Sequence, residues 1–364
     1  YYLQYWHLVP ALNLDKWTVY SNRNLNDIPS SKYNISSLEI KTPSNYHITT
    51  ELKKIKTELL TRNGFKYSYW ESKEIYDPKI YIEKERSYNQ IEENNLMFFK
   101  NKNIESYSLN KNQFKISNKK VLDFLVNELD ISLNNKFILS DVDYNNNKIY
   151  DLNLLPKILQ VYPEKFIYEL QFLKVLISKV LDNFLIINPR EEYWLKDGIQ
   201  TYIMISYVEK FYPKISLVGS LSKFPGLKNL YASKLKYNDK YFLAILHMHR
   251  INNTQKLSIP KDSLLKFNER IANNYKSGLL LYNLSNKIKK LEFSRIISKS
   301  LKMNNENSAL FFKNKINKHF DNSSYLDSLI DIKNINHLNY YSETATLKKS
   351  LNHKPFKIKL VKDI

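Results

Sequence analysis

The chain of 364 residues contains no cysteine and only 5 glycines. Without cysteine, a disulfide scaffold, a thiolate-ligated zinc site, an iron–sulfur cluster and a cysteine nucleophile are all excluded. The few glycines form neither a G-x-G-x-x-G pattern nor a phosphate-binding loop, which excludes the common dinucleotide and P-loop sites. A membrane-spanning helix is not expected either, because the longest apolar stretch, residues 166–187, is interrupted by Glu169, Lys174, Lys179 and Asp182.

The composition is otherwise that of a folded protein, with 43% hydrophobic and 25% charged residues. The length exceeds that of one typical domain. The formal net charge is +20, but only 7 of the 56 basic residues are arginine. Arginine supplies the bidentate and stacking contacts of specific nucleic-acid recognition. We therefore expect no specific nucleic-acid partner, and a polyanion-binding module remains an alternative.

The hydrophobic pattern changes its period along the sequence. Residues 1–95 alternate apolar with polar side chains between turn clusters, which predicts strands. Further along, apolar residues recur at helical spacing, which predicts a mainly helical region. Strands are also expected at 137–143 and within 341–364. The expected helices cover residues 119–128, 163–185, 194–211, 239–252, 260–300 and 304–320.

The most informative local signal is residues 191–202, which read E-E-Y-W-L-K-D-G-I-Q-T-Y. This segment resembles the W-L-x-E-G-x-x-x-Y segment of the aminopeptidase N family of zinc metallopeptidases, which are gluzincins. In that family the Glu is the third zinc ligand, and the resemblance places Asp197 at this position. The other two ligands are the histidines of an H-E-x-x-H motif on the preceding helix, and its Glu is the general base.

Counting back from Asp197 with the family's spacing and no gap reaches residues 174, 175 and 178. These are Lys174, Val175 and Ser178, so both histidines and the base are replaced. Catalytic zinc needs three protein ligands, and water activation needs a base. The resemblance therefore implies a degenerate, catalytically inactive member that binds no zinc and no other cofactor.

Other segments match the family in the right order. Residues 5–11 resemble its W-x-P-x-P-A segment, and residues 43–50 resemble the P-x-x-Y…T strand that follows. Residues 274–278 resemble the Y-x-K-G segment, whose Tyr donates a hydrogen bond to the oxyanion of the tetrahedral intermediate. Tyr275 matches that residue, although a core tyrosine is the alternative. Residues 148–156, at the place of the exopeptidase loop, lack its Gly, Met and Glu.

The resemblance implies an α+β fold. A β-rich N-terminal part, the end of a saddle-like β domain, would precede a thermolysin-like, mainly helical domain of the catalytic type. On this basis residues 1–95 form the C-terminal portion of the β domain and residues 96–340 the (pseudo)peptidase domain. Residues 341–364 would begin a further β segment.

The expected function is that of a polypeptide-binding or scaffold subunit in a larger assembly. Its partners would be other protein subunits or a polypeptide segment. Bacterial relatives with this β-strand pattern are commonly envelope or secreted proteins, so the resemblance implies an extracytoplasmic location, although the sequence shows no signal-peptide pattern. An active hydrolase with a relocated site is an alternative. His247 and His249 are the only closely spaced histidines, and they could share a metal ion on a strand but not on a helix.

A lysine can replace the charge of a lost metal ion. Lys174 and Ser178 are four residues apart and lie on one helix face, with Gln171 and Asp182 in the same polar row. Facing Asp197, the Lys174 ammonium would supply the missing positive charge. We therefore expect a Lys174–Asp197 contact within about 4 Å, or one bridged by Ser178 or water.

Overall fold

The computed structural model describes most of the sequence. The described residues are 1–3, 6, 8, 11–14, 32–60, 64–75, 78–93, 96–101, 109–131, 136–149, 152, 160–226, 231–303, 306–332, 343–347 and 358–362.

The N-terminal part consists of short strands, as expected for residues 1–95. They form three small sheets, with the strand orders β2-β5-β4, β1-β6-β3 and β7-β8-β9. All pairs are antiparallel except β8 with β9, which are parallel and joined through α1. The strands are β1 (Tyr2–Leu3), β2 (Tyr33–Pro43), β3 (His47–Thr50), β4 (Lys53–Leu60), β5 (Phe65–Ile75), β6 (Ile80–Glu83), β7 (Tyr88–Glu93), β8 (Leu96–Asn101) and β9 (Lys136–Leu139).

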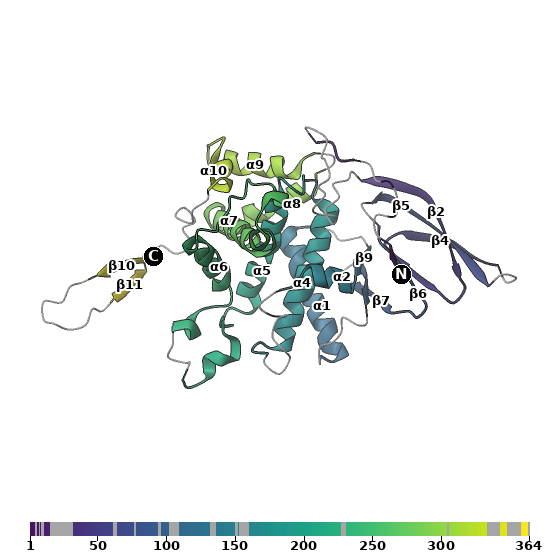
Figure 1. Cartoon of the computed structure of the whole chain (residues 1–364), viewed down its shortest axis with the longest axis horizontal. Coiled ribbons are helices and arrows are strands. Elements are labelled where there is room, and N and C mark those ends of the chain that lie inside the picture. The colour runs from purple at the N-terminus through teal and green to yellow at the C-terminus, as the bar shows by residue number, and fades with distance from the viewer. Residues whose placement is uncertain are drawn as a thin grey trace.

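Helices dominate the described residues between Asp141 and Ile330, and Figure 1 shows β2, β4, β5 and β6 on one side of them. The fold is therefore α+β, as the sequence predicted. The described α-helices are α1 (Lys111–Leu129), α2 (Asp141–Asn146), α4 (Glu164–Phe184), α5 (Tyr193–Phe211), α6 (Asp239–Arg250), α7 (Asn273–Ile288), α8 (Lys290–Leu301), α9 (Ser308–His319) and α10 (Tyr325–Ile330). A π-helical turn, η6 (Asn268–Ala272), precedes α7, and there are 3-10 turns at η3 (Gly219–Lys223), η4 (Tyr231–Lys234) and η5 (Lys261–Ser263).

The strand expected at residues 137–143 is shorter than predicted. The strand ends at Leu139, because Ser140 caps the start of α2. The Ser140 hydroxyl accepts a hydrogen bond from the Asp143 backbone N–H, and the Asp143 carboxylate accepts one from the Ser140 backbone N–H. Such a reciprocal pair satisfies two amide hydrogens that a helix start leaves open. The apolar pattern continues past the end of the strand, and the capping signal at Ser140 marks the boundary.

Helices α4 and α5 form the centre of the core. Most residues of α4 are buried, and its side chains Phe166, Phe172 and Leu176 are 0% exposed. No proline or glycine interrupts the helix, so its apolar faces pack without a kink. The core encloses both helices that carry the sequence-predicted site.

Helices α5 and α7 pack closely where two glycines lie. A Cβ atom on Gly278 of α7 would come closer than 3.0 Å to Thr201 of α5, a separation that real Cβ atoms essentially never show. A Cβ on Gly198 would lie 3.0 Å from the Leu281 side chain. Both glycines belong to the family-like segments, so their place in the sequence has a packing reason in this fold.

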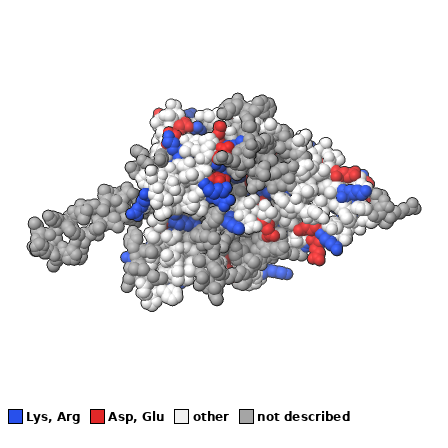
Figure 2. All heavy atoms as spheres, viewed as in Figure 1, with Lys and Arg blue, Asp and Glu red and all other residues white. Residues whose placement is uncertain are grey.

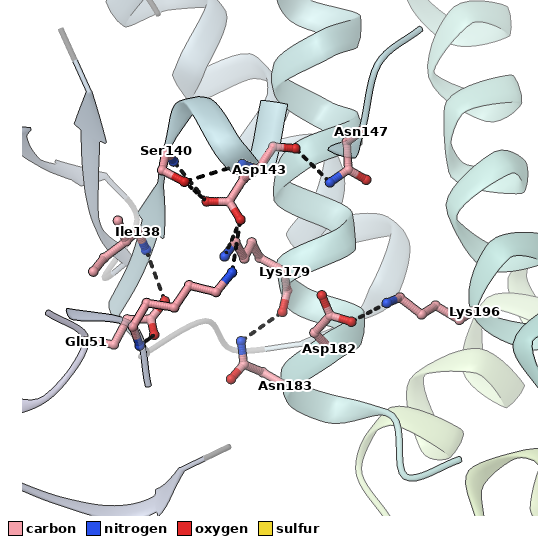
Figure 3. Close-up of polar contacts among 10 residues, drawn as sticks. Glu51, Ile138, Ser140, Asp143, Asn147, Lys179, Asp182, Asn183 and Lys196 are labelled. Atoms are coloured by element: carbon pink, nitrogen blue, oxygen red, sulfur yellow. Dashed lines mark hydrogen bonds and ion pairs between the residues drawn. The ribbon is translucent and has the colours of Figure 1, made fainter. Parts of the chain in front are cut away.

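A buried ion cluster connects the strands to the helices (Figure 3). The Asp143 carboxylate accepts from Lys179 of α4 at 2.7 Å and from Lys79, just before β6, at 3.1 Å. Its other oxygen accepts from the Ser140 hydroxyl at 2.7 Å. Glu51, after β3, accepts from the backbone N–H groups of Ile138 and Lys79.

The charges of this cluster shift one another's pKa values. Burial raises the pKa of Asp143, but Lys179 and Lys79 outweigh it and lower that pKa to about 2. Burial also works against the charge on Lys79, yet Asp143 raises the pKa of Lys79 above its usual range. The pKa of Glu51 is raised by its burial, which the lysines oppose. Burial and the charge of Lys79 lower the pKa of Lys179, which Asp143 opposes. Asp143 is thus held as a carboxylate between the two lysines.

Near the C-terminus, β10 (Glu343–Leu347) and β11 (Ile358–Lys362) pair in antiparallel orientation. Strand structure expected within residues 341–364 is therefore present in the described part. Among the described residues, no helix is long and apolar enough to cross a membrane. The domain boundaries at 95/96 and 340/341 remain a prediction.

Candidate functional site

The positions that match the zinc ligands lie on α4 and α5. Lys174 and Ser178 are half-buried on α4, whereas Val175 is fully buried in the core. The Lys174 ammonium donates to the backbone carbonyl oxygen of Lys148 at 2.7 Å. Next to it, Gln200 of α5 donates to the carbonyl oxygen of Lys174 at 3.0 Å, which fixes the two helices against each other.

Asp197 lies in the second turn of α5. Its Oδ2 atom is buried and has no hydrogen-bond partner among the described residues. Burial raises the pKa of Asp197, while the charges of Lys261, Lys196 and Lys174 oppose that rise. The carboxylate therefore has positive neighbours, but none of them bonds to this oxygen.

The expected Lys174–Asp197 ion pair is not formed. Between described residues, the ion pairs within 4.0 Å include Lys196 with Asp182 but none that joins Lys174 to Asp197. Lys174 instead reaches the Lys148 carbonyl, and Gln171 of the same row donates to the Asn147 carbonyl at 3.0 Å. Residues 147 and 148, just after α2, therefore accept the hydrogen bonds of this polar row, including the one from Lys174 that we expected Asp197 to accept.

The structure brings Tyr275 into the same small pocket as Lys174. The pocket has a volume of about 20 Å³ and lies between α4, α5, α6, η6 and α7. The Tyr275 ring packs edge-on against Tyr241, with ring centroids 4.7 Å apart. We call this pocket the cationic pocket. Its polar lining includes Lys148, Lys174, Lys240, Arg270, Asn274 and Tyr275.

The helix that carries Tyr275 is anchored on both sides of it. Asn273 donates to the Tyr193 hydroxyl at 2.9 Å. The buried Lys276 ammonium donates to the backbone carbonyl oxygens of Gln255 at 3.0 Å and Ile332 at 2.6 Å. Burial lowers the pKa of Lys276 to about 8. These bonds fix the start of α7 and so the position of Tyr275.

Positive charge dominates the cationic pocket. Lys148, Lys174, Lys240 and Arg270 come from four different segments, and none of the described lining residues is acidic. Lys240 donates to the Tyr237 hydroxyl at 2.5 Å and lies over that ring, 3.9 Å from its centroid. Figure 2 shows lysine and arginine side chains over the part of the visible face where α6 lies in Figure 1. The sequence identified Lys174 here, but not Lys148, Lys240 or Arg270, which no local motif connects.

The residues at the matched positions do not fit a zinc ion. Catalytic zinc takes three N, S or O ligands from the protein. The matched positions on α4 carry an ammonium, an aliphatic side chain and a hydroxyl, so Asp197 is the single carboxylate among them. Elsewhere in the described part of the sequence, no three His, Asp or Glu side chains are grouped so that they could hold a metal. His247 and His249 both lie on α6, where side chains two residues apart point about 200° away from each other.

A larger cavity, of about 560 Å³, is at the other end of α5. Along the helix axis, its first lining residue, Val208, is about 17 Å from Asp197. Its charged lining is of both signs, with Lys236 and Lys287 beside Glu209 and Asp239. Glu209 already accepts from the Tyr282 hydroxyl at 2.5 Å. This cavity therefore does not select a ligand by charge.

Two family-like segments lie mostly outside the described residues. Of residues 5–11, residues 6, 8 and 11 are described, and the Trp6 indole N–H donates to the Pro78 carbonyl at 3.0 Å. In residues 148–156, the exopeptidase-loop position, 148, 149 and 152 are described. Residues 47–50 of the P-x-x-Y…T match form β3, which pairs with β6.

Comparisons with known proteins support the fold. No family model and no curated protein matches the sequence. Among solved structures, it is similar to an M1 zinc metallopeptidase from Deinococcus radiodurans, with a TM-score of 0.54 and 10% identity over 85% of this protein and 66% of that one. A mutant from the same organism, bound to a Tyr-Ser-Ala substrate, gives a TM-score of 0.55 at 10% identity, over 85% of this protein and 66% of the mutant.

A two-domain mutant M1 zinc metallopeptidase bound to L-arginine gives a TM-score of 0.55 at 10% identity, over 86% of this protein and 67% of that one. The present sequence thus spans about two thirds of the length of the enzymes it matches. Identity at this level shows a shared fold and not a shared activity. The protein therefore has the fold of the M1 zinc metallopeptidases, the family whose sequence segments it resembles.

Proposed function

We propose that this protein is a metallopeptidase-like protein without peptidase catalysis, which binds a polypeptide segment or serves as a scaffold subunit of a larger assembly. The observation that carries the proposal is the chemistry of the matched positions on α4. Lys174 brings a positive charge to a ligand position, and Val175 is buried where the general base would be. Neither residue can do the work of the residue it replaces.

Polypeptide binding is the function that this fold can retain after its catalytic groups are lost. The fold's neighbours include a structure with a bound Tyr-Ser-Ala substrate. In the present protein the cationic pocket keeps Tyr275 beside Lys174, so a recess remains where the family-like segments meet. Partner subunits and an extracytoplasmic location stay predictions of the resemblance.

The relocated hydrolase has less support. It needs a second constellation of catalytic groups, and the closest histidine pair lies on a helix with diverging side chains. A polyanion-binding module is favoured by the net charge of +20 alone. We keep both as outcomes that experiment can separate.

The test is hydrolysis of aminoacyl p-nitroanilides and of unblocked peptides by the purified protein with added zinc. We expect no turnover above that of a boiled sample. An active M1 enzyme assayed in parallel shows that the substrates and metal are adequate. Turnover that is lost on chelation and restored by zinc would contradict the proposal.

A further inference from the structure

We propose that the 560 Å³ cavity at the end of α5 is a binding site for a small uncharged molecule that carries aromatic rings. The proposal does not depend on polypeptide binding and goes beyond it, because it adds a second site with a ligand of a different class. The cavity is lined by α5 and the segment after it, by the start of α6, by α7 and by α10. Its volume lies within the range of about 300–1,000 Å³ that is usual for small-molecule sites.

The first argument is the aromatic lining of the cavity. Four tyrosine rings line it, those of Tyr212, Tyr237, Tyr282 and Tyr325. Aromatic rings bind other rings edge-on or in offset stacks, so a wall of tyrosines favours a ligand that has rings of its own. The lining also contains the aliphatic side chains of Val208, Ile215, Leu280, Leu284 and Leu329. Apolar surface of the ligand is therefore removed from water on several sides.

The second argument is that these rings are held in place by the protein itself. The Tyr212 hydroxyl donates to the Glu169 carboxylate at 2.6 Å, and the Tyr282 hydroxyl donates to Glu209 at 2.5 Å. The Tyr237 ring packs edge-on against two neighbouring aromatic rings. A ligand therefore meets walls that are already ordered, and its binding loses little free energy to the ordering of side chains.

The third argument is charge. The charged residues of the described lining are two lysines and two acids, Lys236, Lys287, Glu209 and Asp239, so their charges cancel in a protein whose net charge is +20. The two acids already accept hydrogen bonds from groups of this protein, and Lys287 donates one. A charged ligand would be attracted by one pair and repelled by the other, and it would lose its hydration. An uncharged ligand avoids both costs.

One amide group of the lining can orient the ligand. Asn283 is half-buried on α7, and its side chain makes no hydrogen bond to another described residue. Small-molecule sites typically combine an apolar lining with a few polar groups that fix the orientation of the ligand. An aromatic molecule with an N–H or O–H group can donate a hydrogen bond to the amide oxygen of Asn283.

The experiment compares two fluorescent probes that differ by one sulfonate group. N-phenyl-1-naphthylamine is uncharged and has one N–H group, and 8-anilinonaphthalene-1-sulfonate is its anionic derivative. Both become brighter in apolar surroundings, so titration of the purified protein gives both dissociation constants. We expect one uncharged probe per protein molecule, bound at least about tenfold more tightly than the anion. The net charge of +20 by itself favours the anion, so this order cannot come from general attraction.

Variants show whether the probe lies in the cavity. Asn283→Trp on α7 and Leu329→Trp on α10 each add a large ring to the lining, and each should weaken binding of the uncharged probe at least about tenfold. Both side chains are half-buried and lie on different helices, so one variant tests the site even if the other unfolds. Asn314→Trp is the matched control, because Asn314 is exposed on α9 and outside the lining. It should leave the affinity unchanged.

Three results would overturn the inference. Tighter binding of the anionic probe would show attraction by overall charge. Binding of the uncharged probe that folded variants at Asn283 and Leu329 leave intact would place the probe elsewhere on the protein. Absence of saturable binding of the uncharged probe would show that the cavity takes no ligand of this class. None of these results bears on the proposed function, whose test is peptide hydrolysis.

Discussion

Replacing Asp143 by Asn should lower the free energy of unfolding by about 3–5 kcal/mol, the loss seen when one partner of a buried ion pair is removed. The Asp143 side chain is 5% exposed, and those of Lys179 and Lys79 are 8% and 15% exposed. The variant leaves both ammonium groups buried without their shared carboxylate. Asparagine keeps the size of the side chain but has one acceptor oxygen, so the loss reports the charge together with the hydrogen bonds to the second oxygen. Urea denaturation at neutral pH measures it.

The matched control is Asp182→Asn. Asp182 pairs with Lys196, but its side chain is 50% exposed, so we expect a loss of only about 0–1 kcal/mol. The pH dependence of the free energy of unfolding gives a second control. The folded pKa of Asp143, about 2, lies below the ordinary value near 4, so its contribution is present above pH 4 and is lost as the pH falls towards 2. A loss in Asp143→Asn no larger than in Asp182→Asn would contradict the structure.

Replacing Gly278 by Ala should destabilise the protein by about 1–3 kcal/mol, the usual effect of overpacking a core. The new methyl group would overlap the Thr201 side chain, so α5 and α7 must move apart. The effect should exceed that of Gly198→Ala, because the nearest atom there is the end of a flexible leucine. Alanine's better helix propensity, worth up to about 1 kcal/mol, opposes both losses.

Gly226→Ala is the control, since nothing lies within 4 Å of a Cβ at that position. We expect a change within about 0.5 kcal/mol there. Thr201→Gly in the Gly278→Ala background should recover part of the loss, whereas Thr201→Ala should not, because its Cβ remains in place. Thermal unfolding of the set measures the order. Equal stability of Gly278→Ala and Gly226→Ala would disprove the close helix contact.

The sequence predicted the central helices well, because α4 and α5 are long, apolar and free of internal proline. The family resemblance places Lys174 and Tyr275 at positions of one site, and both residues line the cationic pocket. The direct Lys174–Asp197 ion pair is not formed, because Lys174 donates to the Lys148 carbonyl of the segment after α2, whose placement over α4 depends on long-range packing. A contact bridged by Ser178 or water stays a prediction.

The sequence could not show which charged residues are buried. Lys179 reads as an interruption of an apolar run, yet its ammonium pairs with Asp143, 36 positions earlier. Pairing at that separation has no local pattern. The boundary at Ser140, in contrast, was predictable, because Ser140 and Asp143 have the spacing of a capping box.

Zinc binding to the purified protein and to its Lys174→His/Ser178→His variant, measured side by side by metal analysis after dialysis, tests the central claim most directly. The claim is that α4 holds an ammonium and a hydroxyl where the M1 fold would place zinc ligands opposite Asp197. We predict no stoichiometric zinc in the natural protein and about one zinc per molecule in the variant, where two histidines four residues apart join Asp197. Stoichiometric zinc in the natural protein, or none in a folded variant, would contradict the account.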